Sequence, residues 1–218
     1  MIQRGRRWAL AGGTSAGMKL PPPGGRWAGI LYRAHHPRWS YAPASGAGAA
    51  RHGGRFNRRG VPALYTALDP KTAWMEAQQG MPFKAQPLTL VAYRLDCELI
   101  VDLTDGPVLA SAAIDPADLA CPWEDLVARG LEPPSWRLAD ALLDAGWHGA
   151  IVPSFAPGAA FSPDVACSGH PEARLGQAAD WSGYGRNMVL WNWSDRPPCQ
   201  IQVIDDFGRL PLNDASWR

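Results

Sequence analysis

The stretch HGGRFNRRGVPALYTALDPKTAWMEA, residues 52–77, predicts a strand that turns directly into a helix. VPALYTA (61–67) is an apolar run with β-prone residues, which is typical of a buried strand. Asp69 followed by Pro70 is typical of a helix N-cap with proline in the first helical position. The apolar residues that follow predict a helix that continues to about Gln79.

Three side chains of this stretch form an unusual set for a packed core: Arg55, Tyr65 and Glu76. Arg55 follows two glycines, where its planar fork is suited to gripping a phosphate; a turn with a solvated arginine is the alternative. Tyr65 is either a core tyrosine or a ring that stacks on a flat group such as nicotinamide. Glu76 lies near the apolar face of its helix, where a glutamate needs a partner. It therefore either pairs with an arginine or stabilises an oxocarbenium ion.

Arg33 and Ser154 are two further candidates outside this stretch. Arg33 lies in a predicted strand over 27–35, either as a structural edge-strand arginine or as part of a pocket. Ser154 ends GAIVPS (149–154), a short buried strand, and either caps a turn or donates a hydrogen bond to a phosphate or a ribose. No G-x-S-x-G motif surrounds it, which excludes a serine hydrolase of that type.

Histidine and cysteine spacing argues against a metal site. His35 and His36 are adjacent, and the other three histidines are isolated. The four cysteines are widely spaced and form no C-x-x-C pair, which argues against a zinc site and against a dense disulfide framework. We therefore predict no metal and a reducing, cytoplasmic compartment.

Composition and charge limit the class of protein further. The 218 residues are 46% hydrophobic, with 21 basic and 20 acidic side chains. This balance does not favour a nucleic-acid partner held by bulk electrostatics, and no window is long enough for a membrane span. Residues 1–20 are basic with a broken apolar run, so we expect a disordered leader there and not a signal peptide. Residues 21–218 are expected to form a single domain with its core over 27–206.

The remaining periodicity favours an α+β fold, because strands and helices do not alternate regularly. Residues 36–54 and 155–185 read as loops. Strands are predicted over 27–35, 61–67, 87–96, 99–103, 149–154, 187–193 and 200–206, and helices over 69–79, 107–129 and 135–146.

Four segments together resemble the RES domain, the toxin half of bacterial toxin–antitoxin pairs of the ParT-like or RES-Xre type. They are LYRAH, HGGRFNRRGVPALYTALDPKTAWMEA, AIVPS and GRNMVLWNW, and the resemblance spans about residues 27–206. The stretch 52–77 is its most specific part, because the glycine pair, Arg, Tyr and Glu all match in order. The long segment 155–185 departs from the family pattern.

The resemblance implies a fold similar to that of ADP-ribosyltransferases, with NAD as co-substrate in a cleft between two small sheets. Carried onto this chain, it implies that Arg55 binds the NAD phosphates or ribose and that Tyr65 stacks on nicotinamide. Glu76 would hydrogen-bond the ribose beside the scissile bond. Arg33 and Ser154 would complete the pocket.

The resemblance also implies an activity and partners. The enzyme would cleave the nicotinamide–ribose bond of NAD and transfer ADP-ribose to a protein acceptor, with phosphoribosyl pyrophosphate synthetase as a candidate. An NAD glycohydrolase or an NAD phosphorylase is the alternative, and a nucleotide-binding module without catalysis is a second one. A neighbouring antitoxin would cover the cleft of such a toxin.

Overall fold

The computed structural model describes residues 19–21, 24–78, 87–156, 181 and 183–215. The helix end expected near Gln79, most of the leader and most of segment 155–185 lie outside these residues. Within them the chain is a mixed α+β fold, as predicted. Its strands are β1 (Gly25–His35), β2 (Leu64–Ala67), β3 (Thr89–Asp102), β4 (Gly149–Pro153), β5 (Arg186–Leu190) and β6 (Cys199–Ile204).

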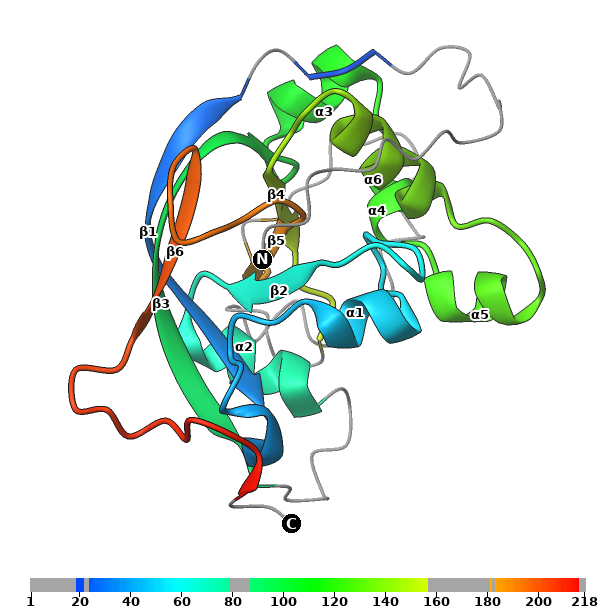
Figure 1. Cartoon of the computed structure of the whole chain (residues 1–218). Coiled ribbons are helices and arrows are strands. Elements are labelled where there is room, and N and C mark those ends of the chain that lie inside the picture. Colours follow the sequence, from blue (N-terminus) through cyan, green and yellow to red (C-terminus); the bar gives the residue numbers. More distant parts are fainter. Residues whose placement is uncertain (1–18, 22–23, 79–86, 157–180, 182, 216–218) are drawn as a thin grey trace.

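The strands form one connected sheet that closes on itself (Figure 1). Its order is β1-β2-β5-β4-β3-β6, and β1 also pairs with β3, so the first five strands make a closed barrel. All pairings are antiparallel except that of β3 with β4. The expectation of two separate small sheets is therefore wrong for the described residues. The long β3 explains the closure, because it pairs with β1 along its length while β6 and β4 take successive parts of its other edge.

Strand β4 shows why this sheet has two cores. Each of its five residues is buried, as expected for a strand covered on both faces. Ile151 packs inside the barrel with Met188 and Leu190 of β5. Ala150 and Val152 face the opposite way, into a second core with the helices. The alternation follows from the two-residue period of a strand.

The helices are short and mostly gather on one side of the barrel. In Figure 1, α3 to α6 lie away from β1, β3 and β6. The bounds are α1 (Ala47–His52), α2 (Pro70–Gln78), α3 (Gly106–Ala112), α4 (Pro116–Leu119), α5 (Trp123–Ala128) and α6 (Pro134–Asp144), with a 3-10 turn at Pro37–Trp39. None of these helices has the length and apolar character needed to cross a membrane.

Several elements differ from the sequence-based prediction. The two strands expected over 87–96 and 99–103 are one strand, β3, which continues through Leu99 at a φ of 55°. The helix expected over 107–129 is divided into α3, α4 and α5. The interruptions fit Pro116 and Pro122, because proline donates no helical hydrogen bond. The loop predicted over 36–54 contains α1.

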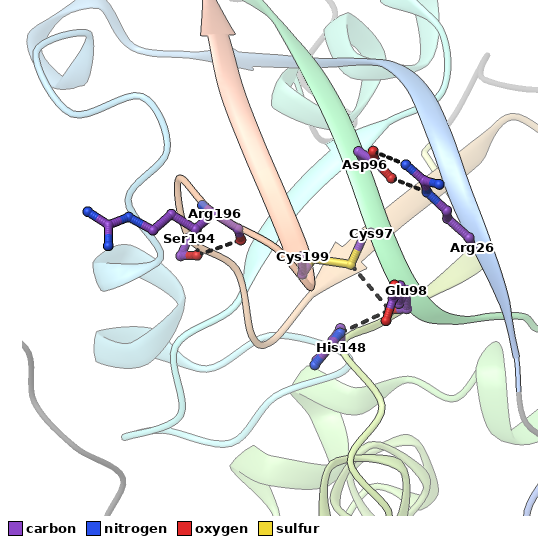
Figure 2. The surroundings of a disulfide bond; sticks show 8 residues. All are labelled: Arg26, Asp96, Cys97, Glu98, His148, Ser194, Arg196 and Cys199. Carbon is purple, nitrogen blue, oxygen red and sulfur yellow. Dashed lines mark hydrogen bonds and ion pairs between the residues drawn. A yellow bond between two sulfur atoms is a disulfide. The ribbon is translucent and has the colours of Figure 1, made fainter.

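Cys97 and Cys199 pair across the sheet, which the sequence did not predict. They are opposite each other in the register of β3 and β6 and form a disulfide (Figure 2). One disulfide is not a dense framework. Disulfides are, however, rare in the reducing compartment that we predicted from the cysteine spacing. His148, which is isolated in the sequence, lies beside this pair.

Candidate functional site

A pocket of about 820 Å³ opens at the end of the barrel where β2 leads into α2. Its volume is in the range of small-molecule sites. Four of the five side chains singled out from the sequence line it, namely Arg33, Arg55, Tyr65 and Glu76; Ser154 does not. Asn187 of β5 and Phe155 also contribute to the wall.

The backbone of the Arg55 loop is fixed by side chains from distant elements. The carbonyl oxygens of Gly54, Arg55 and Phe56 each accept a hydrogen bond. The donors are, in that order, Trp136 Nε1 at 2.7 Å, Ser135 Oγ at 2.6 Å and Trp191 Nε1 at 2.8 Å. Two donors come from the first turn of α6 and one follows β5, so the loop is held against both the helices and the sheet. Such anchoring preorganises the loop for binding.

The glycine pair has a steric reason at Gly54. A Cβ atom there would lie 2.6 Å from the Tyr65 hydroxyl and 2.7 Å from Asn57 Oδ1. That hydroxyl accepts from the Phe56 backbone N–H at 3.0 Å and donates to Asn57 Oδ1 at 2.8 Å. Glycine therefore allows the loop to approach Tyr65, whose hydroxyl is held in place while its ring faces the pocket.

Burial controls the ionisation of Tyr65. Burial raises the pKa of its phenol well above the ordinary value, although the nearby Arg55 charge acts in the opposite direction. Tyr65 is therefore neutral at physiological pH, and its ring is an apolar stacking surface. This state suits contact with a flat ring better than it suits proton transfer.

The Arg55 side chain is partly committed to the protein. Its Nη1 donates to the carbonyl oxygens of Leu119, at 3.4 Å, and of Cys121. The guanidinium lies over the ring of Phe155, 4.7 Å from its centroid. Burial lowers the pKa of Arg55, while the Cys121 and Glu76 groups raise it, and an arginine remains charged under these conditions. The geometry thus presents a fixed positive charge at the pocket wall.

Glu76 is held by two donors that share one carboxylate oxygen. Ser154 Oγ donates to Glu76 Oε1 at 2.6 Å, and Asn187 Nδ2 donates to the same atom at 2.5 Å. Hydrogen bonds to a charged acceptor are about twice as strong as neutral ones. The rotamer of Glu76 is therefore fixed from behind, by a serine after β4 and an asparagine on β5.

Ser154 and Arg33 are both engaged in hydrogen bonds to other protein groups. Ser154 is buried behind Glu76 and contacts the carboxylate instead of lining the pocket. Arg33 reaches the pocket wall, but its Nη1 donates to the carbonyl oxygens of Pro43 and Ser45 at 2.9 and 3.0 Å. Arg33 therefore holds the loop before α1 in place. This corresponds to the structural role that the sequence left open for it, although the residue also lines the pocket.

A scan against family profiles matches the RES domain over residues 30–182, more than half of the chain. The chain belongs to the RES domain family. RES domains are associated with NAD-processing activity and with toxins. No curated protein matches the chain. The matched range contains Arg33, Arg55, Tyr65, Glu76 and Ser154.

Asn187 is the site residue that the sequence analysis of this RES domain missed. It lies in GRNMVLWNW, a segment quoted for the resemblance without a role for any of its side chains. A polar residue at the start of an otherwise apolar strand is the available signal. Its contact with Glu76 depends on the pairing of β5 with both β2 and β4, which the sequence does not reveal.

Proposed function

We propose that this protein cleaves the nicotinamide–ribose bond of NAD and transfers ADP-ribose to a protein acceptor, on a fold similar to that of ADP-ribosyltransferases. The main support for this proposal is the carboxylate of Glu76, which is held in a fixed position at the wall of the pocket. Both described donors converge on Oε1, so Oε2 is the atom that we assign to the ribose.

The chemistry of NAD cleavage suits this arrangement. When the C1′–N bond breaks, its electron pair goes to nicotinamide, which leaves as a neutral molecule, and positive charge develops on the ribose. A carboxylate fixed beforehand stabilises that charge without reorganising at the moment of reaction. The acceptor then bonds to C1′ and releases a proton, and no electrons are gained or lost overall.

Arg55 and Tyr65 supply binding in this proposal. The guanidinium lies over Phe155 and close enough to Glu76 for the two charges to interact. Its N–H groups other than those of Nη1, which make no hydrogen bond among the described residues, are assigned to the diphosphate. The Tyr65 ring, anchored through its hydroxyl, is assigned to the nicotinamide face. Ser154 and Asn187 act as positioning residues, because they reach the substrate through Glu76.

The acceptor defines which enzyme this is. A protein acceptor makes it a transferase, with phosphoribosyl pyrophosphate synthetase as the candidate to test. Water makes it an NAD glycohydrolase, and inorganic phosphate makes it an NAD phosphorylase. Each outcome drains NAD or modifies an enzyme of nucleotide synthesis in the cytoplasm. The protein would then arrest growth as a toxin, restrained by an antitoxin that covers the pocket.

The deciding experiment is product analysis by mass spectrometry. The purified chain is incubated with NAD, with and without phosphate, and with phosphoribosyl pyrophosphate synthetase. Nicotinamide together with an ADP-ribose mass increment on the added protein supports the transferase. Nicotinamide with free ADP-ribose or ADP-ribose phosphate supports the alternatives. NAD that binds but stays intact, also with acceptors present, would refute catalysis and favour a binding module.

A further inference from the structure

The end of β4 opposite Ser154 carries a second cluster of reactive side chains. His148 immediately precedes β4, whereas Ser154 immediately follows it. A five-residue strand spans about 16 Å, so this cluster is separate from the Glu76 pocket. It consists of Cys97 on β3, Cys199 on β6 and His148.

The three side chains are buried and converge. Cys97, Cys199 and His148 are 0%, 3% and 8% exposed. One donor atom from each lies within 4.8 Å of the other two, and theirs is the one such group of three among the described residues. Figure 2 shows His148 below the sulfur pair, with Nδ1 2.9 Å from the carbonyl oxygen of Glu98. That oxygen also lies 3.4 Å from Cys97 Sγ.

The backbone beside the cluster is strained. Leu99, directly after Glu98, has a φ of 55°, which is uncommon for a residue with a side chain. Its carbonyl accepts from the His148 backbone N–H at 3.1 Å. Strained backbone persists where the surroundings overdetermine it and tends to occur at functional sites. Here it accompanies the carbonyl of Glu98 that faces both the sulfur and the imidazole.

We propose that, once the Cys97–Cys199 disulfide is reduced, these two cysteines and His148 hold one soft divalent cation such as zinc. In the reduction, two molecules of a low-molecular-weight thiol give two electrons and two protons to the disulfide and leave as their own disulfide. Each cysteine thiol then loses its proton as its sulfur binds the cation. Water or the Glu98 carbonyl oxygen takes the fourth position.

Donor chemistry and distance support this site. Two thiolates and an imidazole are a ligand set that zinc uses. With a zinc–sulfur distance of about 2.3 Å, a tetrahedral site separates its two sulfurs by about 3.8 Å. Sulfurs that are no longer bonded move apart to a contact distance of roughly 3.5–4.0 Å. Reduction therefore brings the pair to the spacing that a cation requires, and the disulfide and the cation exclude each other.

Cobalt(II) binding by the full chain tests the proposal. The chain is unfolded and reduced with a phosphine, then refolded without oxygen with or without cobalt, and its folding is checked by circular dichroism. We expect thiolate-to-cobalt charge-transfer absorption that saturates at one equivalent per chain and disappears when zinc is added. Chain refolded with the disulfide intact should show no such absorption.

Variants separate this site from other thiols. Losing even an outer-shell partner costs about 10- to 100-fold in metal affinity, so Cys199→Ser and His148→Ala should each weaken cobalt binding by at least about 100-fold. Cys121→Ala, at the buried free cysteine, should bind like the wild type. Folded, reduced protein that binds no cobalt, or Cys199→Ser that binds equally well, would overturn the proposal. If the reduced chain does not refold, zinc content decides: protein purified from cells without oxygen must contain more zinc than Cys199→Ser.

Discussion

Asn187 allows a quantitative test of how Glu76 is positioned. Its Nδ2 atom donates to Glu76 Oε1 at 2.5 Å, and Ser154 supplies the other described donor to that oxygen. Asn187→Leu removes the donor and keeps the number and branching of the side-chain heavy atoms. A hydrogen bond to a charged group contributes roughly 1.5–3 kcal/mol. If this energy holds the carboxylate for the transition state, kcat falls by roughly 10- to 150-fold, at about 1.36 kcal/mol per factor of ten.

The Michaelis constant and the pH profile distinguish positioning from a general loss of structure. Glu76 acts mainly as charge develops, so the Michaelis constant for NAD should change far less than kcat. Asn187→Asp places a second carboxyl beside Glu76. A neighbouring like charge raises the pKa of a carboxyl, so the acidic limb of the kcat profile should move to higher pH in this variant alone.

The assay is steady-state nicotinamide release across a pH series, with folding verified by circular dichroism. Gln202→Leu is the matched control, because it removes an amide from an exposed position on β6. Ser154→Ala should resemble Asn187→Leu, and the double variant should lose less than the product of the two effects, since both donors serve one oxygen. A folded Asn187→Leu protein with wild-type kcat would refute the positioning role.

Other changes test the remaining parts of the site. Glu76→Gln should lower the rate of nicotinamide release by about 10²- to 10³-fold with little effect on NAD binding measured by calorimetry. Arg55→Ala should raise the Michaelis constant for NAD and lower kcat in steady-state assays. Arg55→Lys should recover only part of the lost activity, because a point charge does not reproduce the planar fork. Gly54→Ala should destabilise the fold by roughly 1–3 kcal/mol in thermal denaturation because its Cβ clashes, whereas Gly48→Ala in α1, with open space around it, should not. Burial lowers the pKa of His35 to about 4, so between pH about 6.5 and 4 this histidine gains a proton in the unfolded chain but not in the folded one. The free energy of unfolding should therefore decrease as the pH is lowered through this range. In His35→Gln, the midpoint of urea unfolding should depend less on pH over the same range.

Local sequence signals predicted the elements around the site well. The cap at Asp69 is confirmed, since its carboxylate accepts from the Thr72 N–H at 2.8 Å, and α2 begins at Pro70. Ser135 is typical of a helix-capping residue in sequence, but α6 begins at Pro134 and the Ser135 hydroxyl donates to the Arg55 carbonyl oxygen instead. A capping residue and a residue that contacts another loop look alike in sequence, because the difference lies in tertiary packing.

The site residues show the same limit. Arg55, Tyr65 and Glu76 lie close together in sequence, on the loop before β2, on β2 and on α2, and all three line the pocket. Arg33 lies on β1 and Ser154 directly follows β4, and the sequence does not show whether their side chains point into the pocket or into the protein. Asn187 on β5 was missed because its position beside Glu76 likewise depends on tertiary packing.

The strand register brings Glu76, Ser154 and Asn187 together in one site, although they are far apart in the sequence. Asn187 is opposite Ala67 of β2 on one side and Val152 of β4 on the other. Glu76 lies in α2, which begins shortly after Ala67, and Ser154 follows β4 two residues after Val152. The carboxylate and its two donors therefore meet at one rim of the barrel because β5 pairs with both neighbours in this register. A shift of one residue would turn Asn187 to the opposite face of the sheet, so the buried alternation of Met188, Val189 and Leu190 that fixes the register also fixes the position of Glu76.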